Sequence, residues 1–450
     1  MTRFRNILIA GALLSPAAAL ADSKASINGS AYKTIEISPE ASTGLNNIFV
    51  AYNTAGCHMT FKTSNGHAAV IYRFSSLGGA YAEEVRDADR ETGSVTIALT
   101  GDDSGYILEE GTSRYYCWVV NYANHYMTLN SITPAGEQDC DYTILEIDGN
   151  ASAITYYTIN GQPRTLSREI TLNYTTQEFN EEIPGYAETE TSKTYESTGN
   201  KLSVSPPAYC TTYFTLTGDR FLREWGMEAT AETYFGNPTA VACKTEAEQE
   251  NPSSDEPSNI MGGDTTGLGG SAPSHISFYS YTTEATAHYE WQLSRNQEFT
   301  SPDYRFYQRD LDYTFDEEGT YYIKFIGSNA DGTCETEGEV YTVSIGASAL
   351  EIPNAFSPNG DGINDVWKVS YRSLTDFHCE IFNRNGQRIY GFNDPAGGWD
   401  GTWHGKNVNP GVYYYVISAT GADGKKYKKS GDINIIRSVN YGSSSVEPAE

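Results

Sequence analysis

The chain has 450 residues, enough for about three or four domains that each bury a core of their own. Its formal net charge at pH 7 is −28, with 58 Asp and Glu against 30 Lys and Arg. This excess of negative charge disfavours nucleic acid as a partner, and it is typical of a solvated acidic surface or of cation binding.

Residues 1–21 are predicted to be a secretory signal peptide. Arg3 and Arg5 precede an apolar run from Ile7 to Leu14, and Ala19-Leu20-Ala21 provides a cleavage site of small residues. No later stretch approaches the roughly 18 apolar residues of a membrane helix. We therefore expect the chain to leave the cytoplasm, with no transmembrane segment in the mature protein.

Two β-sandwich domains are predicted next, at residues 22–135 and 136–250. Both contain short alternating stretches, such as Ile48 to Tyr52 and Tyr115 to Val120, which are separated by Gly, Asn and Asp. Such spacing indicates tandem immunoglobulin-like sandwiches, so the expected fold class is all-β.

Seven cysteines in an exported chain suggest disulfides, and the odd number leaves at least one unpaired. Cys57 and Cys117 are spaced like the inter-sheet pair of an immunoglobulin-like domain. Cys140, Cys210 and Cys243 allow three pairings in the second domain, and we take Cys210 with Cys243 as the first hypothesis. The remaining cysteines, Cys334 and Cys379, look isolated in the sequence.

Residues 251–272 are poor in large apolar side chains and rich in Gly, Ser, Pro and acid, which predicts a flexible linker. A third unit, residues 273–347, contains a strand around Trp291 and a second strand with inward-facing residues at 321, 323 and 325. Its motif elements Tyr313, Gly319-x-Tyr321 and Asn329-x-Asp331-Gly332 resemble a PKD-type immunoglobulin-like domain.

The last unit, residues 348–438, opens with the sequence IPNAFSPNGDGINDVWKV, in which two strands flank a turn dense in Asn, Asp and Gly. The turn Asn385-Gly386 then predicts a hairpin, and about seven short strands in this region predict a small sandwich. A polar tail, residues 439–450, is expected to be disordered.

The ordered motifs PNAFSPNGDGIND, IFNRNGQRIY, GWDGTWHGK, PGVYYYVI and GDINIIR resemble the gliding-motility-associated C-terminal domain. That family is the type B sorting signal of type IX secretion cargo, so the resemblance implies the type IX machinery at the outer membrane as a partner. The residues that carry the motifs are Pro353, Asn354, Phe356, Pro358, Asn359, Gly360, Asp361, Gly362, Asn364, Asp365, Asn383, Gly386, Trp399, Asp400, Gly401, Gly411, Tyr413 and Tyr414.

Oxygen ligands on a glycine-rich turn suit Ca²⁺, and the turn of the opening motif carries four such residues. They are Asn359, Asp361, Asn364 and Asp365. The alternative is a turn whose side chains bond to its own backbone, because the spacing of an EF-hand loop and its final Glu are absent. No other cofactor is expected.

Charge is distributed unevenly along the chain. Residues 350–437 carry ten Lys or Arg against nine Asp or Glu, a net of +1, whereas residues 22–349 carry a net of −29. The lysines between Lys425 and Lys429 form a basic cluster, which is either a contact for the export machinery or a solvated turn.

No catalytic motif occurs in the sequence, and the neighbouring pair Cys57-His58 cannot act together because adjacent strand residues face opposite sides. We therefore expect a non-catalytic, adhesin-like surface or secreted protein that binds an extracellular glycan or protein. The alternatives are an exported hydrolase of polysaccharide or peptide, with a site in residues 22–250, and a subunit of a surface filament or adhesin assembly.

Overall fold

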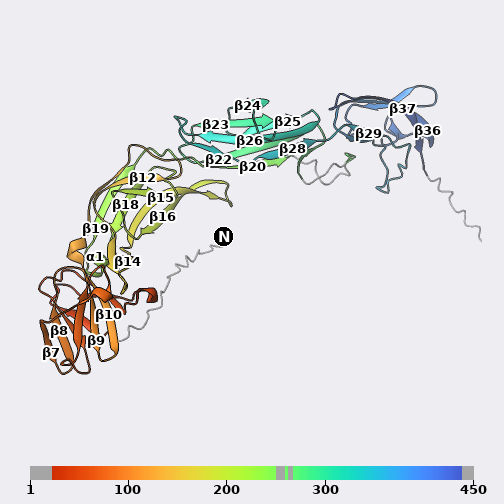
Figure 1. The fold of residues 1–450 in the computed structure, drawn as a ribbon. Coiled ribbons are helices and arrows are strands. Elements are labelled where there is room, and N and C mark those ends of the chain that lie inside the picture. The colour runs from red at the N-terminus through yellow and green to blue at the C-terminus, as the bar shows by residue number, and fades with distance from the viewer. Residues whose placement is uncertain (1–22, 250–258, 262–266, 438–450) are drawn as a thin grey trace, which may run out of the picture.

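A computed structural model describes residues 23–249, 259–261 and 267–437. In these residues the predicted all-β class is confirmed: four β-sandwich units follow one another along an elongated, bent molecule (Figure 1). The helical elements of the described residues are three 3-10 turns and one short α-helix: η1 (Ala41–Thr43), η2 (Gly79–Tyr81), η3 (Tyr122–His125) and α1 (Arg220–Glu224). None of these helices is long and apolar enough to cross a membrane. The predicted signal peptide and the predicted tail lie outside the described residues.

The first unit packs two sheets face to face. In spatial order, one contains β1 (Ala25–Asn28), β4 (His58–Lys62), β8 (Ser94–Ala98) and β7 (Ala88–Glu91). The other contains β2 (Ile35–Ile37), β3 (Asn47–Ala51), β10 (Ser113–Asn121), β9 (Ser104–Glu110), β5 (Val70–Phe74) and β6 (Glu83–Glu84). All the strand pairs of these two sheets except β3 with β10 are antiparallel. Between the sheets, alternate residues such as Met59, Phe61 and Ile97 are buried, as the strand period of two requires.

The second unit begins earlier than predicted. Its strand β11 (Thr128–Pro134) pairs with β12, so residues 128–135 belong to this unit and the expected boundary between 135 and 136 is wrong by one strand. Its sheets, in spatial order, are β11, β12 (Thr143–Asn150) and β17 (Lys201–Val204); β13 (Ile154–Tyr157) and β14 (Pro163–Leu166); and β16 (Gly185–Tyr195), β15 (Ile170–Asn180), β18 (Thr212–Gly218) and β19 (Ala229–Phe235).

The first two units share a continuous hydrophobic core. One face of β10 packs inside the first unit through Cys117 and Val119, and its other face packs through Trp118 and Val120 into a cluster that extends to Phe214 of the second unit. The Trp118 ring lies 5.6 Å from the Tyr157 ring of the second unit. Burial of both faces of one sheet therefore joins two units that the sequence presents as separate domains.

The third unit also begins earlier than predicted. The sequence predicts that the second domain extends to residue 250, but strand β20 (Cys243–Gln249) pairs along its whole length with β22 (Ser274–Thr282) of the third unit. One sheet is β20, β22 and β25 (Leu311–Phe315). The other is β21 (Leu268–Gly270), β28 (Tyr341–Ile345), β26 (Gly319–Ser328), β23 (His288–Ser294) and β24 (Tyr304–Phe306), with β27 (Glu335–Glu337) beside β26.

The predicted linker 251–272 is therefore not a connection between the second and third units. Both strands that flank its undescribed residues belong to the third unit, because β20 pairs with β22 and β21 pairs in parallel with β28. Between them, Met261 donates its backbone N–H to Tyr371 of the fourth unit, 2.6 Å away. Residues 250–258 and 262–266 lie outside the described residues, so the predicted flexibility there stays a prediction.

The fourth unit is built on a mixed sheet of five strands. In spatial order these are β30 (Ala355–Phe356), β37 (Lys426–Ile435), β36 (Gly411–Gly421), β32 (Leu374–Phe382) and β33 (Arg388–Phe392). Two small sheets cover it: β29 (Ala349–Glu351) with β31 (Ser370–Arg372), and β34 (Thr402–Trp403) with β35 (Lys406–Asn407). The predicted hairpin at Asn385-Gly386 joins β32 to β33.

The disulfide predictions are wrong. Cys57, Cys117, Cys210 and Cys243 are all free, and the one disulfide of the described residues joins Cys140 to Cys334. The Cys57 thiol instead donates to the Asn53 carbonyl within its own turn, at 3.2 Å. Cys210 and Cys243 belong to different units once β20 is placed in the third. The bridge thus ties the second unit to the third.

This pairing predicts the number of reactive thiols. In the unfolded but unreduced protein a thiol reagent should count five cysteines, and after reduction it should count all seven. A Cys140→Ser variant should show one thiol more than the unreduced wild type, because Cys334 loses its partner. The matched Cys57→Ser variant should show one thiol fewer than the wild type. A wild-type count lower by two would contradict this pairing by indicating a second bridge.

Candidate functional site

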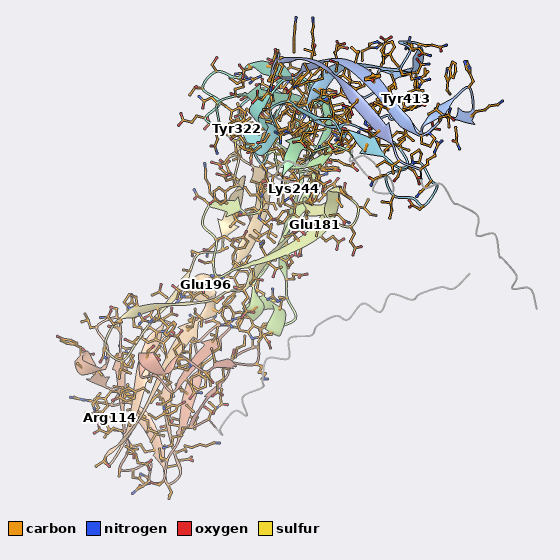
Figure 2. The ribbon with its side chains drawn as sticks, turned by 90° about the vertical axis from the view of Figure 1, so that its right-hand side faces the viewer. Arg114, Glu181, Glu196, Lys244, Tyr322 and Tyr413 are labelled. Atoms are coloured by element: carbon orange, nitrogen blue, oxygen red, sulfur yellow. A yellow bond between two sulfur atoms is a disulfide. The ribbon has the colours of Figure 1, made fainter. Side chains whose placement is uncertain are left out.

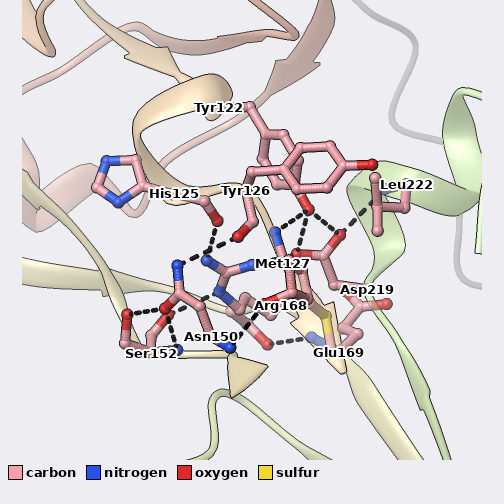
Figure 3. Close-up of polar contacts among 12 residues, drawn as sticks. Tyr122, His125, Tyr126, Met127, Asn150, Ser152, Arg168, Glu169, Asp219 and Leu222 are labelled. Atoms are coloured by element: carbon pink, nitrogen blue, oxygen red, sulfur yellow. Dashed lines mark hydrogen bonds and ion pairs between the residues drawn. The ribbon is translucent and has the colours of Figure 1, made fainter. Parts of the chain in front are cut away.

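The joint between the first two units contains a polar network around a fully buried ion pair (Figure 3). Arg168 and Asp219, both of the second unit, form an ion pair with 2.5 Å between Nη1 and Oδ2, and each side chain is 0 % exposed. The Tyr122 hydroxyl of the first unit lies 3.1 Å from both Asp219 oxygens, to which it can donate. Burial first, and then the Asp219 carboxylate, hold the pKa of Tyr122 above its ordinary value, so the phenol remains a donor.

The remaining hydrogen-bonding groups of this pair are also satisfied from several segments. Arg168 donates through Nη2 to the His125 carbonyl of the first unit and through Nε to the Ser152 carbonyl at 2.7 Å. Asp219 accepts from the Leu222 amide at 3.0 Å and so caps helix α1. A buried ion pair needs such partners because desolvation of both charges is costly. The network therefore has the character of a structural joint.

In the fourth unit, the sequence motifs converge on one buried cluster. The Trp399 ring lies 5.6 Å from the Phe356 ring and 5.3 Å from the Tyr413 ring, so three separate motifs meet there. Trp367 and Trp399 exchange backbone hydrogen bonds of 2.8 and 3.0 Å. Both indoles are almost fully buried and donate to backbone carbonyls.

Arg437 ties the same motifs together from the end of β37. Its guanidinium donates to the carbonyls of Pro358 at 3.1 Å, Val408 at 2.6 Å and Gly401 at 3.4 Å. Gly401 has φ of +76°, and a Cβ there would lie 3.1 Å from Pro358 and 3.2 Å from Phe356. Only glycine fits this close approach without displacement.

The Asn- and Asp-rich turn is bonded to itself. Asp365 accepts from the amides of Asn359, Gly360 and Gly362 at 2.7 to 2.8 Å, and these bonds hold the pKa of its carboxyl below the usual range. Asp361 likewise accepts from the Ile363 amide and the Asn359 side chain. The structure thus describes the self-bonded turn that was the alternative to a calcium site.

A groove of about 600 Å³ lies beside this turn, lined by residues that include Pro353, Phe356 and Trp367. Asn259 closes one side of it by donating through its side chain to the carbonyls of Val369 at 2.7 Å and Pro395 at 2.8 Å. These hydrogen bonds attach residues 259–261 to the fourth unit.

A family model described as the CHU_C Type IX secretion signal domain matches residues 350–435. This match spans the strands, the convergent tryptophans and the self-bonded turn described above. Residues 350–435 form a type IX secretion signal domain. The resemblance inferred from the motifs is therefore confirmed, and the domain implies export to the cell surface or secretion, with the type IX machinery involved.

A second family model, Fibronectin type III domain, matches residues 132–233, which lie in the second unit and support a start before residue 136. No curated protein matches the chain. The PKD resemblance of the third unit stays a prediction.

Several solved structures resemble the chain at low identity. The tetra-tandem repeat in the extending region of a large adhesion protein is 9% identical, covers 86% of this chain and 96% of its own, and has a TM-score of 0.21. The FN1-FN3 domains of chicken CNTN1 are 10% identical, and the match covers 68% of this chain and 98% of theirs, with a TM-score of 0.23. A structure from a 1.5-MDa bacterial ice-binding adhesin is 11% identical, and the match covers 69% of this chain and 98% of that structure, with a TM-score of 0.22.

Not every predicted motif residue joins the signal domain's buried cluster. Asn383 and Gly386 bond within their own hairpin turn, where the Asn383 side chain accepts from the Asn385 and Gln387 amides. Tyr414 faces the opposite side of the sheet and is 46% exposed. Sequence reasoning missed Arg437 and Asn259, since nothing in a linear pattern shows which distant carbonyls a side chain reaches.

Among residues 23–249, 259–261 and 267–437, no three His, Cys, Asp or Glu side chains gather as a metal site. Ca²⁺ at Asn359, Asp361, Asn364 and Asp365 stays a prediction. Burial, helped by the charge of Glu380, raises the pKa of Cys379 to about 12, and burial also raises the pKa of Cys57, which disfavours the reactive thiolate at both positions.

Removing one partner of the buried ion pair should destabilise the joint. We expect Arg168→Met to lower the free energy of unfolding by about 3–5 kcal/mol, because Asp219 is left buried and uncompensated. Calorimetry of the full chain measures the shift. The matched variant Arg114→Met, whose exposed arginine pairs with Glu109 at 2.6 Å, should cost less than about 1 kcal/mol. Equal shifts for the two variants would contradict a structural role for the buried pair.

The stability of the self-bonded turn should depend on pH, because the Asp365 carboxylate accepts its hydrogen bonds. Its pKa is lowered in the folded state, so its stabilisation is present above the usual aspartate value of about 3.9 and is lost as the pH falls through the lower folded value. Hydrogen exchange, followed by NMR, should show faster exchange of the Asn359, Gly360 and Gly362 amides in Asp365→Ala at neutral pH. The control Asp432→Ala should leave these amides unchanged. Wild-type exchange rates in D365A would refute the hydrogen bonds.

Proposed function

We propose that this protein is a non-catalytic, adhesin-like surface protein whose signal domain directs it through type IX secretion. The observation that carries the proposal is the signal domain at residues 350–435, preceded by three β-sandwich units. Such units display ligand-binding surfaces on rigid sheets, and a signal domain gives such an array a route to the outside.

The body of the protein supplies surfaces suited to an extracellular glycan or protein. Tyr213 and Tyr234, on neighbouring strands of the second unit, are 59% and 55% exposed, and their ring centroids are 5.0 Å apart. Exposed tyrosines offer an apolar face for packing and a hydroxyl for hydrogen bonding. The labelled side chains of Figure 2 show how charged and aromatic groups are spread over successive units.

Deletion of residues 350–450 should leave the remaining chain in the periplasm, because the surface read by the export machinery is then missing. The complementary fusion should behave in the opposite way: an unrelated folded reporter in place of residues 22–346 should still be exported. Fractionation of a type IX-competent host into periplasm, surface and medium measures both. Normal export of the truncated chain would overturn the proposed function.

A further inference from the structure

The central sheet of the signal domain carries an exposed apolar row on its outer face. Val412, Tyr414 and Val416 of β36 are 45%, 46% and 49% exposed, whereas the intervening Tyr413 and Tyr415 pack against the core. We call these three residues the outer stripe. It lies at the centre of the sheet, because β36 is paired on both sides, with β37 and β32.

The strands beside the outer stripe add a mixed border. Tyr414 stands opposite the half-buried Phe382 of β32, and Val416 stands opposite Glu380, which pairs with Arg388. On the other side, the residues of β37 opposite the stripe are Asn434, Asp432 and Ser430, and Asp432 is exposed. The exposed Lys426 and Lys428 lie beyond the Val416 end of the stripe. Lys428 is registered with Ser418, the next outward residue of β36 beyond the stripe. The apolar stripe is thus followed, along the same face of the sheet, by a basic region at Lys426 and Lys428.

A water-facing sheet face usually carries polar residues, so three apolar residues in its central strand need an explanation. Packing inside the domain does not provide one, since the core lies on the opposite face of the sheet. A central apolar patch with a polar rim is the arrangement found at protein interfaces.

We propose that the outer stripe is the surface through which the signal domain docks on a protein of the secretion apparatus, and that this partner presents an apolar patch with carboxylates at one end. The inference rests on the proposed function. Charge complementarity supports the choice of partner: residues 350–437 have a net charge of +1, and Lys426 and Lys428 lie beyond the Val416 end of the stripe, whereas residues 22–349 carry −29. A second copy of this chain fits less well, because two molecules of charge −28 repel each other.

The test removes the apolar character of the stripe without changing the strand. Threonine keeps a strong strand preference, so the full chain carrying Val412→Thr, Tyr414→Thr and Val416→Thr should fold. We expect its exported fraction to fall about tenfold, as loss of central interface anchors predicts. The control Tyr213→Thr with Tyr234→Thr removes similarly exposed rings from the second unit and should export normally. Melting curves of the purified full-length variants establish that each is folded.

A charge-reversal pair provides an independent measurement. Lys426→Glu with Lys428→Glu alters exposed side chains only and should also reduce export, because it places like charges against the acidic end of the partner's patch. If the threonine variant fails to fold, this pair decides the question. Normal export of the pair would then overturn the proposal.

The remaining outcomes separate the two claims. If deletion of residues 350–450 blocks export while folded threonine and glutamate variants export normally, the docking surface is wrong and the proposed function stands. If the deletion exports normally, the proposed function itself is wrong. Light scattering addresses the other occupant: a wild-type dimer that becomes a monomer in the threonine variant would make the stripe a self-interface and overturn the proposal.

Discussion

The ion pair between Arg168 and Asp219 fixes the first joint of the molecule. Burying two opposite charges stabilises a structure only when their remaining hydrogen-bonding groups also find partners. Here Tyr122 and the His125 carbonyl come from the first unit, and the other partners come from the second. Satisfying this pair therefore requires that both units be in place, and the shared apolar core around Trp118 imposes the same relative position.

The joints further along the chain use different chemistry. The second and third units are joined by the disulfide from Cys140 to Cys334 and by a few hydrogen bonds, such as that from the Asn329 side chain to the Thr239 carbonyl at 3.1 Å. The third unit meets the signal domain through Ser373, whose amide and hydroxyl bond to Ser271 and to the Gly346 carbonyl. A shared apolar core thus distinguishes the first joint from the second, which a disulfide crosses, and from the third, where Ser373 makes hydrogen bonds.

Local patterns predicted what local physics determines. The alternation at residues 321, 323 and 325 gave the buried face of β26 correctly, and the Asn- and Asp-rich turn forms because its side chains bond to amides a few residues away. The failures all concern long-range partners. Strand β10 is buried on both faces, so no alternation marks the joint it makes, and spacing in the sequence did not reveal that Cys334 meets Cys140. Similarly, the acidic, glycine-rich residues 251–272 come soon after β20, so the sequence predicted that the residues of β20 belong to the second unit.

In the signal domain, strand β36 supplies residues both to the buried cluster and to the exposed face of the sheet. Phe356, Trp399 and Tyr413 are turned inward, and Gly401 permits the close approach that Arg437 then fastens. These residues build the shape, and a partner that approaches the opposite face of the sheet cannot touch them. That opposite face instead presents Val412, Tyr414 and Val416, which alternate along β36 with the inward-facing residues. Recognition of a domain built in this way depends on the folded sheet, because Val412, Tyr414 and Val416 of the motif PGVYYYVI form one outward row only when β36 is paired on both sides.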